Sequence, residues 1–404
     1  MTVNDCGPTD AIDKPVRLNV ERFAEIPGLP QELTEDLQIQ LEAGAGNWAI
    51  QESSASRKLN ARIGNVKCVA DDWYVQKNGI WSPRSKDEYR TIALEVLPPK
   101  WRTHAHAMQV MNRLESERQV NQSVFCGAAK FDDQGGVYLA VQNGTLHITS
   151  NRVMLLPTEP SHGFTAALSV AWDEGAPMKL FGQVLNDTLP DSSDRELLLD
   201  VLATALIPDC RHEAALVCQG ESGTGKSTVI APVAAMFGST CAFLSMADIC
   251  HPSGYKLANL HHKLVNLATE LNTLEMEDTG LFKQLVSGEA FTARPIYGKP
   301  FEMRSTATLI FLANSLPRFK YGTDAEVRRL RFIRFGNKVT KPDVNLKERV
   351  ALEAPGLFVE LVYRAQELLR GRPLREPGQY GRETVQRLRS AMTRWDSLCL
   401  RFAC

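Results

Sequence analysis

The spacing of hydrophobic positions changes along the chain, and the changes predict different kinds of structure. In residues 71–85, two short aromatic runs flank the turn pair Asn78-Gly79, which is a strong hairpin signal. Residues 103–120 have apolar positions at helical spacing, and residues 135–148 again have the pattern of strands around a turn. We therefore expect an α+β region here, preceded by a polar, proline-containing stretch that is partly disordered.

A helix is expected to lead into the second half of the chain. Ser193 and Glu196 have the spacing of a capping box, and the apolar positions that follow share one face until Pro208. Beyond residue 211, short apolar runs alternate with helical segments, which predicts an α/β domain with a mainly parallel sheet flanked by helices. The runs lie at residues 214–219, 263–269, 308–314 and 331–335. A last helix is expected to end at Gly371, which is placed as a C-terminal cap.

Composition narrows the class of protein. The chain has 404 residues, 44% of them hydrophobic and 23% charged, with a formal net charge of −1. Any site for nucleic acid must therefore concentrate positive charge locally. No apolar run approaches the roughly 18 residues of a membrane span, and the N-terminal residues lack the pattern of a signal peptide. Nine scattered cysteines without a CxxC pair argue against zinc and favour reduced thiols, so we expect a cytoplasmic protein with no membrane partner.

The clearest chemical motif is "GESGTGKS" at residues 220–227, a full match to the phosphate-loop pattern G-x-x-x-x-G-K-[ST]. It follows a strand-like run and opens a helical segment, so backbone N–H groups and the helix N-terminus can converge on phosphate oxygens. Lys226 is expected to reach the β- and γ-phosphates of ATP, and the Ser227 hydroxyl to bind Mg²⁺. The alternative is an ordinary glycine-rich turn. The predicted nucleotide-binding residues are Gly220, Glu221, Ser222, Gly223, Thr224, Gly225, Lys226, Ser227 and Thr228.

Hydrolysis needs further groups at the ends of neighbouring strands. Glu270 ends the run "KLVNLATE" and can hold Mg²⁺ indirectly while it orients the attacking water, unless it is a solvated glutamate. Asn314 ends "TLIFLAN" and can position the same water, or it can be a turn former. Arg328 or Arg329, in "DAEVRRLRFIRF", is suited to reach a neighbouring subunit's γ-phosphate as an arginine finger; a charged strand rim is the alternative.

Residues 288–303, "GEAFTARPIYGKPFEM", have the pattern of a β-hairpin between the glutamate and asparagine strands. Its expected tip carries Tyr297 and Lys299, with Arg294 lower on the same arm. A cation can follow a phosphate backbone while an aromatic face stacks on any base, so these residues are candidate DNA contacts. An ordinary surface hairpin is the alternative.

The order of "GESGTGKS", "KLVNLATE", "LVSGEAFTARPIYGKPFEM", "TLIFLANSLPRF" and "DAEVRRLRFIRF" resembles superfamily 3 helicases, closest to the helicase domain of poxvirus and phage primase–helicases. The resemblance covers about residues 70–395. It implies an AAA+ ATPase that forms a hexameric ring and pulls single-stranded DNA through its pore at a fork. It also implies a replication role for a phage, plasmid or mobile element in a bacterial host, with a separate primase as a candidate partner.

The resemblance also implies a domain order. We expect an N-terminal extension over residues 1–70, an α+β domain over 71–190, an AAA+ motor over 191–340 and a C-terminal helical segment over 341–404. Two other functions remain open at this point. One is a non-translocating regulatory DNA-binding ATPase ring, because only one carboxylate ends the glutamate strand. The other is a small-molecule phosphotransferase of the P-loop class, which would need no oligomer.

Overall fold

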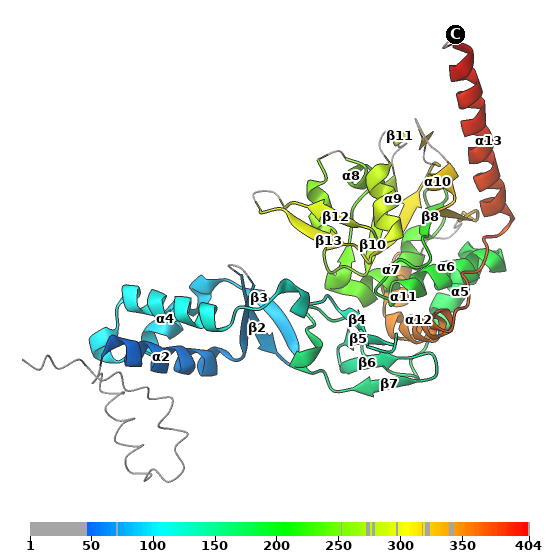
Figure 1. The fold of residues 1–404 in the computed structure, drawn as a ribbon. Helices are drawn as coiled ribbons and strands as arrows, with labels where there is room; N and C mark the ends of the chain where they lie inside the picture. Colours follow the sequence, from blue (N-terminus) through cyan, green and yellow to red (C-terminus); the bar gives the residue numbers. More distant parts are fainter. Residues whose placement is uncertain are drawn as a thin grey trace, which may run out of the picture. The chain divides into compact units, whose positions relative to one another are not determined.

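The computed structural model describes residues 47–69, 72–251, 253–271, 275–276, 279–295, 298–316, 318–319, 324–338 and 343–402. It contains two compact units (Figure 1). Of the described residues, those up to Val75 and those of Pro83–Val120 form the first unit, and those of Gln76–Ser82 and from Asn121 onward form the second. The boundaries expected at residues 70, 190 and 340 stay predictions. The strands of the hairpin at Asn78-Gly79 continue from one unit into the other, which no local sequence signal marks.

The first unit packs three helices around a small core. Helix α2 (Trp48–Ile63) lies against α4 (His104–Glu117) and α3 (Arg90–Glu95), and β1 (Val66–Val69) pairs antiparallel with β2 (Asp72–Lys77), which is followed by β3 (Ile80–Arg84). Helix α2 lies within the expected N-terminal extension of residues 1–70. Its buried side includes the polar residues Gln51 and Ser56 beside Ala55 and Leu59, which masks the apolar stripe in the sequence.

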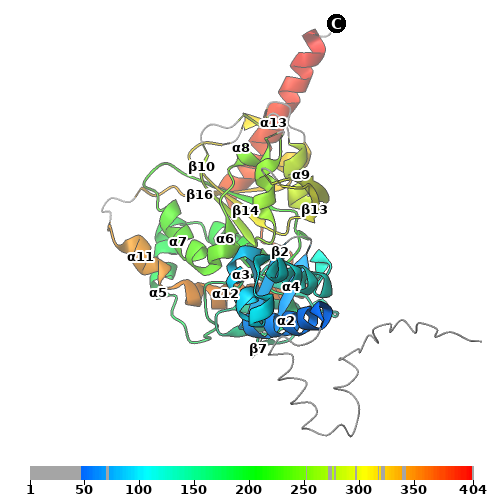
Figure 2. The same cartoon turned by 90° about the vertical axis from the view of Figure 1, so that its left-hand side faces the viewer.

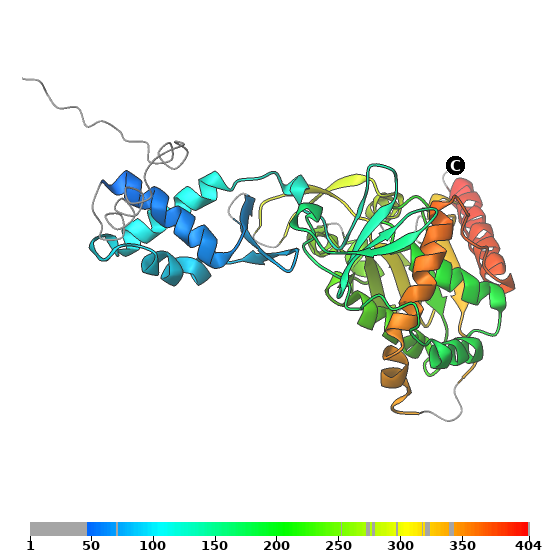
Figure 3. The ribbon, with the colours of Figure 1, turned by 90° about the horizontal axis from the view of Figure 1, so that it is seen from below.

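The second unit begins with a four-stranded antiparallel sheet in which consecutive strands are neighbours. The turn between its two central strands lies at Gln142-Asn143, one residue before the predicted Asn143-Gly144, because Val141 pairs with Gly144. Helix α12 contacts this sheet (Figure 3). The Gln366 side chain donates to the Thr149 carbonyl at 2.9 Å. The strands are β4 (Ala129–Phe131), β5 (Val137–Val141), β6 (Gly144–Ile148) and β7 (Val153–Leu156).

A five-stranded parallel sheet forms the centre of the second unit and confirms the predicted α/β fold. Its order is β16-β8-β14-β10-β9, so the asparagine strand β14 lies between the phosphate-loop strand β8 and the glutamate strand β10. Both faces of the sheet are buried, which explains why its strands are continuous apolar runs. The strands are β8 (Ala215–Gln219), β9 (Cys241–Ala242), β10 (Val265–Leu271), β14 (Thr308–Ala313) and β16 (Leu330–Arg334).

Helices cover the two faces of this sheet. Alternate strand residues face opposite ways, so that Leu216 and Ile310 belong to one core while Val217 and Phe311 belong to the other. Helices α5, α6, α7, α11 and α12 contribute to the first core (Figure 2), and α8, α9 and α13 contribute to the second. Their bounds are α5 (Lys179–Thr188), α6 (Ser192–Thr204), α7 (Lys226–Phe237), α8 (Met246–Ile249), α9 (Gly280–Ser287), α11 (Leu346–Ala351), α12 (Ala354–Leu369) and α13 (Gln379–Phe402).

Two smaller pairs of strands complete the description. Strands β12 (Ala290–Ala293) and β13 (Phe301–Arg304) form an antiparallel hairpin, and β11 (Glu275–Met276) pairs in parallel with β15 (Arg318–Phe319), which precedes the short helix α10 (Asp324–Val327). None of the helices that the structure describes combines the length and apolar character of a bilayer-spanning segment.

Helix boundaries follow local chemistry. The capping box predicted at Ser193 is wrong, because the Asp191 side chain caps α6 two residues earlier, accepting from the Ser193 N–H at 2.8 Å. Gly371 follows α12 with φ +93°, and its N–H donates to the Leu368 carbonyl at 3.0 Å, as a C-terminal cap requires. Leu357, Phe358 and Leu361 of helix α12 lie in the core of the second unit.

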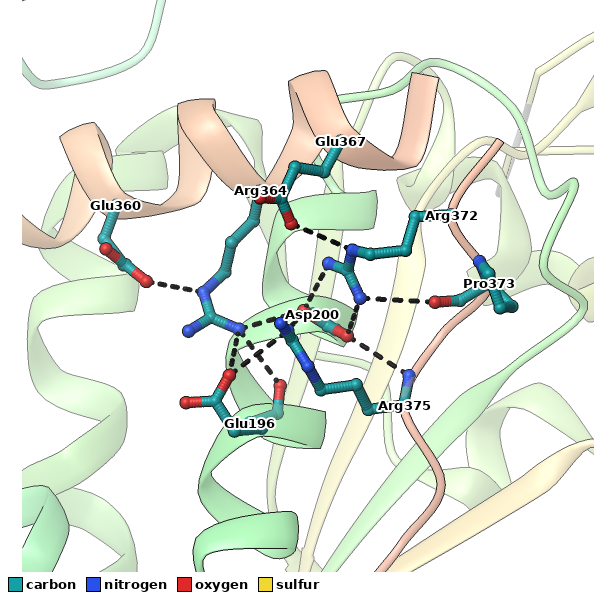
Figure 4. A network of polar contacts seen from close by, with 8 residues as sticks. All are labelled: Glu196, Asp200, Glu360, Arg364, Glu367, Arg372, Pro373 and Arg375. Atoms are coloured by element: carbon teal, nitrogen blue, oxygen red, sulfur yellow. Dashed lines mark hydrogen bonds and ion pairs between the residues drawn. The ribbon is translucent and has the colours of Figure 1, made fainter. Parts of the chain in front are cut away.

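An ionic network fastens α12 and the segment after it to α6 (Figure 4). The Asp200 side chain, fully buried, accepts hydrogen bonds from the side chains of Arg364, Arg372 and Arg375 and from the Arg375 N–H at 2.7–3.2 Å. Burial raises the pKa of Asp200, but the arginine hydrogen bonds and charges outweigh burial, and the net pKa is lowered. Three glutamates lie around the same arginines, at Glu196, Glu360 and Glu367.

Candidate nucleotide-binding site

The predicted phosphate loop connects β8 to α7, as the motif requires. Gly223 and Gly225 have φ values of +80° and +84°, in the left-handed region that favours glycine. A Cβ at Gly220 would meet the Phe335 carbonyl oxygen at 2.5 Å, and one at Gly225 would meet the Thr188 side chain at 2.5 Å. A Cβ at Gly223 would meet no atom within 4 Å. The loop is therefore walled by the protein on one side and open on the other, as a cradle for phosphate oxygens would be.

Lys226, the first residue of α7, folds back over this loop. Its side chain is 9% exposed, and its Nζ donates to the carbonyl oxygens of Gly220 at 2.5 Å and Glu221 at 2.7 Å. Burial lowers the pKa of Lys226 from its ordinary value. The ammonium group thus lies inside the loop, within reach of the oxygens of any phosphate that the loop holds. Ser227, the predicted metal ligand, is the next residue of the same helical turn.

The carboxyl edge of the sheet brings the other predicted residues beside this loop. Gln219 pairs with Ala313 of β14, and Ala313 pairs in turn with Leu271 of β10. The phosphate loop, Asn314 and the end of the glutamate strand therefore leave the sheet side by side. Because parallel strands end at one edge, this is where an α/β sheet binds its ligands.

Glu270 lies in an irregular stretch of β10. Ala268 pairs with Phe311 and Leu271 with Ala313, so two residues of β10 face one residue of β14 between these pairs. This is the pairing of a β-bulge, a feature that is common beside active sites and can redirect a side chain. The described part of Glu270 is its backbone, which lies in β10.

Asn314 is exposed at the first position beyond the β14 ladder. Two residues outside the predicted set reach it. The Gln219 amide Nε2 donates to the Asn314 carbonyl at 3.2 Å, and the Tyr380 hydroxyl of α13 donates to Gln219 Oε1 at 3.0 Å. The sequence does offer a signal for Gln219, because it is a polar residue at the end of a strand directly before the phosphate loop. Tyr380 carries no such mark, because 161 positions separate it from Gln219.

The two candidate finger arginines have different surroundings. Arg329 is 8% exposed, and its guanidinium donates to Ser287 Oγ at 2.8 and 3.2 Å, to the Ala325 carbonyl at 2.9 Å and contacts Glu213 at 3.0 Å. Arg328 is exposed and lines a cleft of about 340 Å³. Arg329 is therefore engaged in its own chain, whereas Arg328 is accessible. The cleft also carries Arg331, Arg382 and Arg389, of which the last two belong to α13.

The predicted hairpin is present over its described residues. Phe291 pairs with Met303 and both side chains are buried, so the base of the hairpin is anchored in the core beside α9. Near the tip, Arg294 Nε donates to the Gly298 carbonyl at 3.3 Å, and Lys299 is exposed. Tyr297 lies outside the described residues.

Two family models each match part of the chain. A family model described as D5 N terminal like matches residues 54–190, and a family of unknown function (DUF5906) matches residues 218–329. The Acanthamoeba polyphaga mimivirus protein "Putative helicase L207/L206" is 26% identical over 167 residues. That alignment covers 38% of this chain and 16% of the viral protein, so the chain spans less than a fifth of that relative.

The fold is similar to apo structures of the C-terminal region of NrS-1. The A form has a TM-score of 0.53 at 13% identity and covers 83% of this chain and 74% of that chain. A second apo structure, of residues 305–718, has a TM-score of 0.52 at 13% identity and covers 84% and 74%. The D5-type match and the viral relative agree with the resemblance to phage and viral-type superfamily 3 helicases, and the NrS-1 comparison shows a shared fold.

Proposed function

We propose that this protein is an ATP-dependent DNA helicase that moves along single-stranded DNA as a ring of identical subunits of the AAA+ class. The observation that carries the proposal is the position of β14 between β8 and β10. This order brings the phosphate loop, Asn314 and the strand of Glu270 to one sheet edge, where a nucleotide-hydrolysing site needs them. The similarity to a viral helicase agrees with a role in DNA replication.

The loop residues fit a bound ATP with Mg²⁺. The open side at Gly223 leaves room for phosphate oxygens, and the buried Lys226 ammonium can exchange loop carbonyls for the oxygens of the β- and γ-phosphates. Ser227 and Glu270 would hold the magnesium ion, directly and through water respectively. When bound, the ion would neutralise charge that develops on the phosphates. Asn314 would orient the attacking water from the neighbouring strand.

Arg328 is the better candidate for a finger that completes the site of an adjacent subunit. Its exposed guanidinium is free of the core packing that occupies Arg329, and the other arginines of its cleft add positive charge around it. A planar guanidinium suits the charge of a transferring phosphoryl group. This arrangement requires an oligomer, for which a hexameric ring is our proposal.

The hairpin would carry the effect of hydrolysis to DNA. Its strands β12 and β13 lie in the chain between β10 and β14, and its base is packed in the same core as both strands. A change at the carboxyl edge can therefore displace it as a unit. Lys299 would contact the phosphate backbone of single-stranded DNA, with Arg294 and Tyr297 as further contacts.

The proposal is tested by measuring ATP hydrolysis with and without single-stranded DNA. We expect DNA to stimulate hydrolysis, and Lys226→Ala to abolish it. Lys347→Ala, at an exposed lysine of α11, is the matched control and should hydrolyse ATP like the wild type. Hydrolysis that does not respond to DNA would refute the helicase assignment. Hydrolysis that survives in Lys226→Ala would refute the assignment of the site.

A further inference from the structure

The Gln219 side chain connects the nucleotide edge to the C-terminal helix. A carbonyl oxygen can only accept a hydrogen bond, so the amide NH₂ group of Gln219 must face the Asn314 carbonyl, 3.2 Å away. The amide oxygen is thereby turned toward Tyr380, whose hydroxyl donates to it at 3.0 Å. The partners alone therefore fix the orientation of this amide.

Tyr380 is itself held firmly. It lies in the first turn of α13, with the Arg334 guanidinium 5.2 Å from its ring centroid. The buried Asp194 of α6 accepts from the Gly378 N–H at 2.8 Å, directly before α13, and from the Arg334 N–H at 3.3 Å. The start of α13 is thus docked between α6 and β16.

This arrangement holds the backbone of Asn314 in place. The main-chain ladder between β8 and β14 ends with the Gly220 N–H donating to the Ala313 carbonyl at 3.0 Å. Asn314 comes next and is exposed at a bend. The Gln219 side chain extends the pairing by one residue and ties the Asn314 backbone to the strand that carries the phosphate loop.

We infer that Gln219 is a positioning residue for hydrolysis. It sets the distance between Asn314 and the phosphate loop, and Tyr380 keeps its amide in the required orientation. This inference rests on the proposed function, because Asn314 matters only if the site hydrolyses ATP. It also links α13 to the site, so that displacement of the start of α13 would release the Asn314 backbone and slow hydrolysis.

The test compares Gln219→Met, which keeps the length of the side chain without its hydrogen bonds, with Tyr380→Phe, which keeps the ring. We expect kcat for ATP to fall about tenfold in Gln219→Met and about threefold in Tyr380→Phe; tenfold corresponds to about 1.4 kcal/mol. The dissociation constant of an ATP analogue should stay within about threefold of wild type, because the phosphate loop is unchanged. Gln386→Met, at an exposed glutamine of α13, is the matched control and should have wild-type kcat.

Combining each variant with Asn314→Ala separates positioning from a general structural effect. If Gln219 acts through Asn314, Gln219→Met should lower kcat no further in the Asn314→Ala background. Wild-type kcat in Gln219→Met, or a full additive loss in the double variant, would overturn the inference while leaving the proposed function intact. A wild-type protein that does not hydrolyse ATP would overturn the proposed function and the inference together.

Discussion

Removing the charge of Asp200 tests how the C-terminal part of the second unit is held. The substitution Asp200→Asn preserves the size of the side chain, but it leaves Arg364, Arg372 and Arg375 without the buried carboxylate that they share. An amide also has only one acceptor oxygen, so one side of the group would present hydrogen-bond donors to guanidinium donors.

The expected loss follows from the remaining contacts. Breaking a buried ion pair costs about 3–5 kcal/mol. Glu196, at 2.9 Å from Arg364 and 3.1 Å from Arg375, and Glu367, at 2.9 Å from Arg372, would continue to neutralise the arginines. We therefore expect a loss near the lower end, about 3 kcal/mol. In a unit of this size the melting temperature should fall by roughly 6–9 °C.

Thermal unfolding followed by circular dichroism measures the shift, and hydrogen exchange locates it. The amides of α12 should exchange faster in Asp200→Asn, because the network joins this helix to α6. The control is Asp343→Asn, which removes an exposed partner of Arg349 and should change stability by less than about 1 kcal/mol. Equal melting temperatures for the two variants would refute the reasoning.

The same carboxylate predicts a pH dependence. Because the net pKa of Asp200 is lowered in the folded protein, its contribution is complete above the ordinary aspartate pKa of about 3.9 and is lost as the pH falls through the lower folded value. The difference in stability between wild type and Asp200→Asn should therefore shrink in strong acid. A difference that stays constant would contradict this assignment of the charge.

Three further predictions concern other parts of the second unit. Burial and the charges of its neighbours lower the pKa of His262 to about 4. As the pH falls from 7 to 5 the unfolded chain therefore takes up the proton first, and the free energy of unfolding should fall. In urea unfolding, His262→Asn should remove about 2 kcal/mol of that fall. Arg328→Ala should lose ATP hydrolysis while its stability stays unchanged. Arg329→Ala should lose about 2 kcal/mol of stability, because its hydrogen bonds are broken. Loss of hydrolysis in Arg329→Ala and loss of stability in Arg328→Ala would exchange their roles. Lys299→Ala should weaken binding to single-stranded DNA and reduce its salt dependence, while Lys347→Ala changes neither; equal binding by both variants would exclude the hairpin as the contact.

Local patterns predicted the parts of the site that depend on neighbouring residues in the chain. The phosphate loop, the strands β14 and β10, and the hairpin are each short segments in which spacing and residue type carry the information. The parallel sheet followed from continuous apolar runs, because both of its faces are covered.

The features that could not be predicted from the sequence depend on contacts between residues far apart in the chain. Arg328 and Arg329 are adjacent in the chain, and Ser287, 42 residues from Arg329, distinguishes them. Helix α12 was predicted from its apolar spacing, but its tie to Asp200, 164 positions from Arg364, was not. Partners this distant in sequence leave no trace in hydrophobic spacing.

Strand separation on a forked duplex tests the central claim most directly. We predict that the wild-type protein separates the strands with ATP and fails to do so with a non-hydrolysable analogue, and that Lys226→Ala fails with either. Electron micrographs of the protein on the same fork with the analogue should show a ring on one strand. A wild-type protein that hydrolyses ATP but leaves the duplex intact would contradict the account.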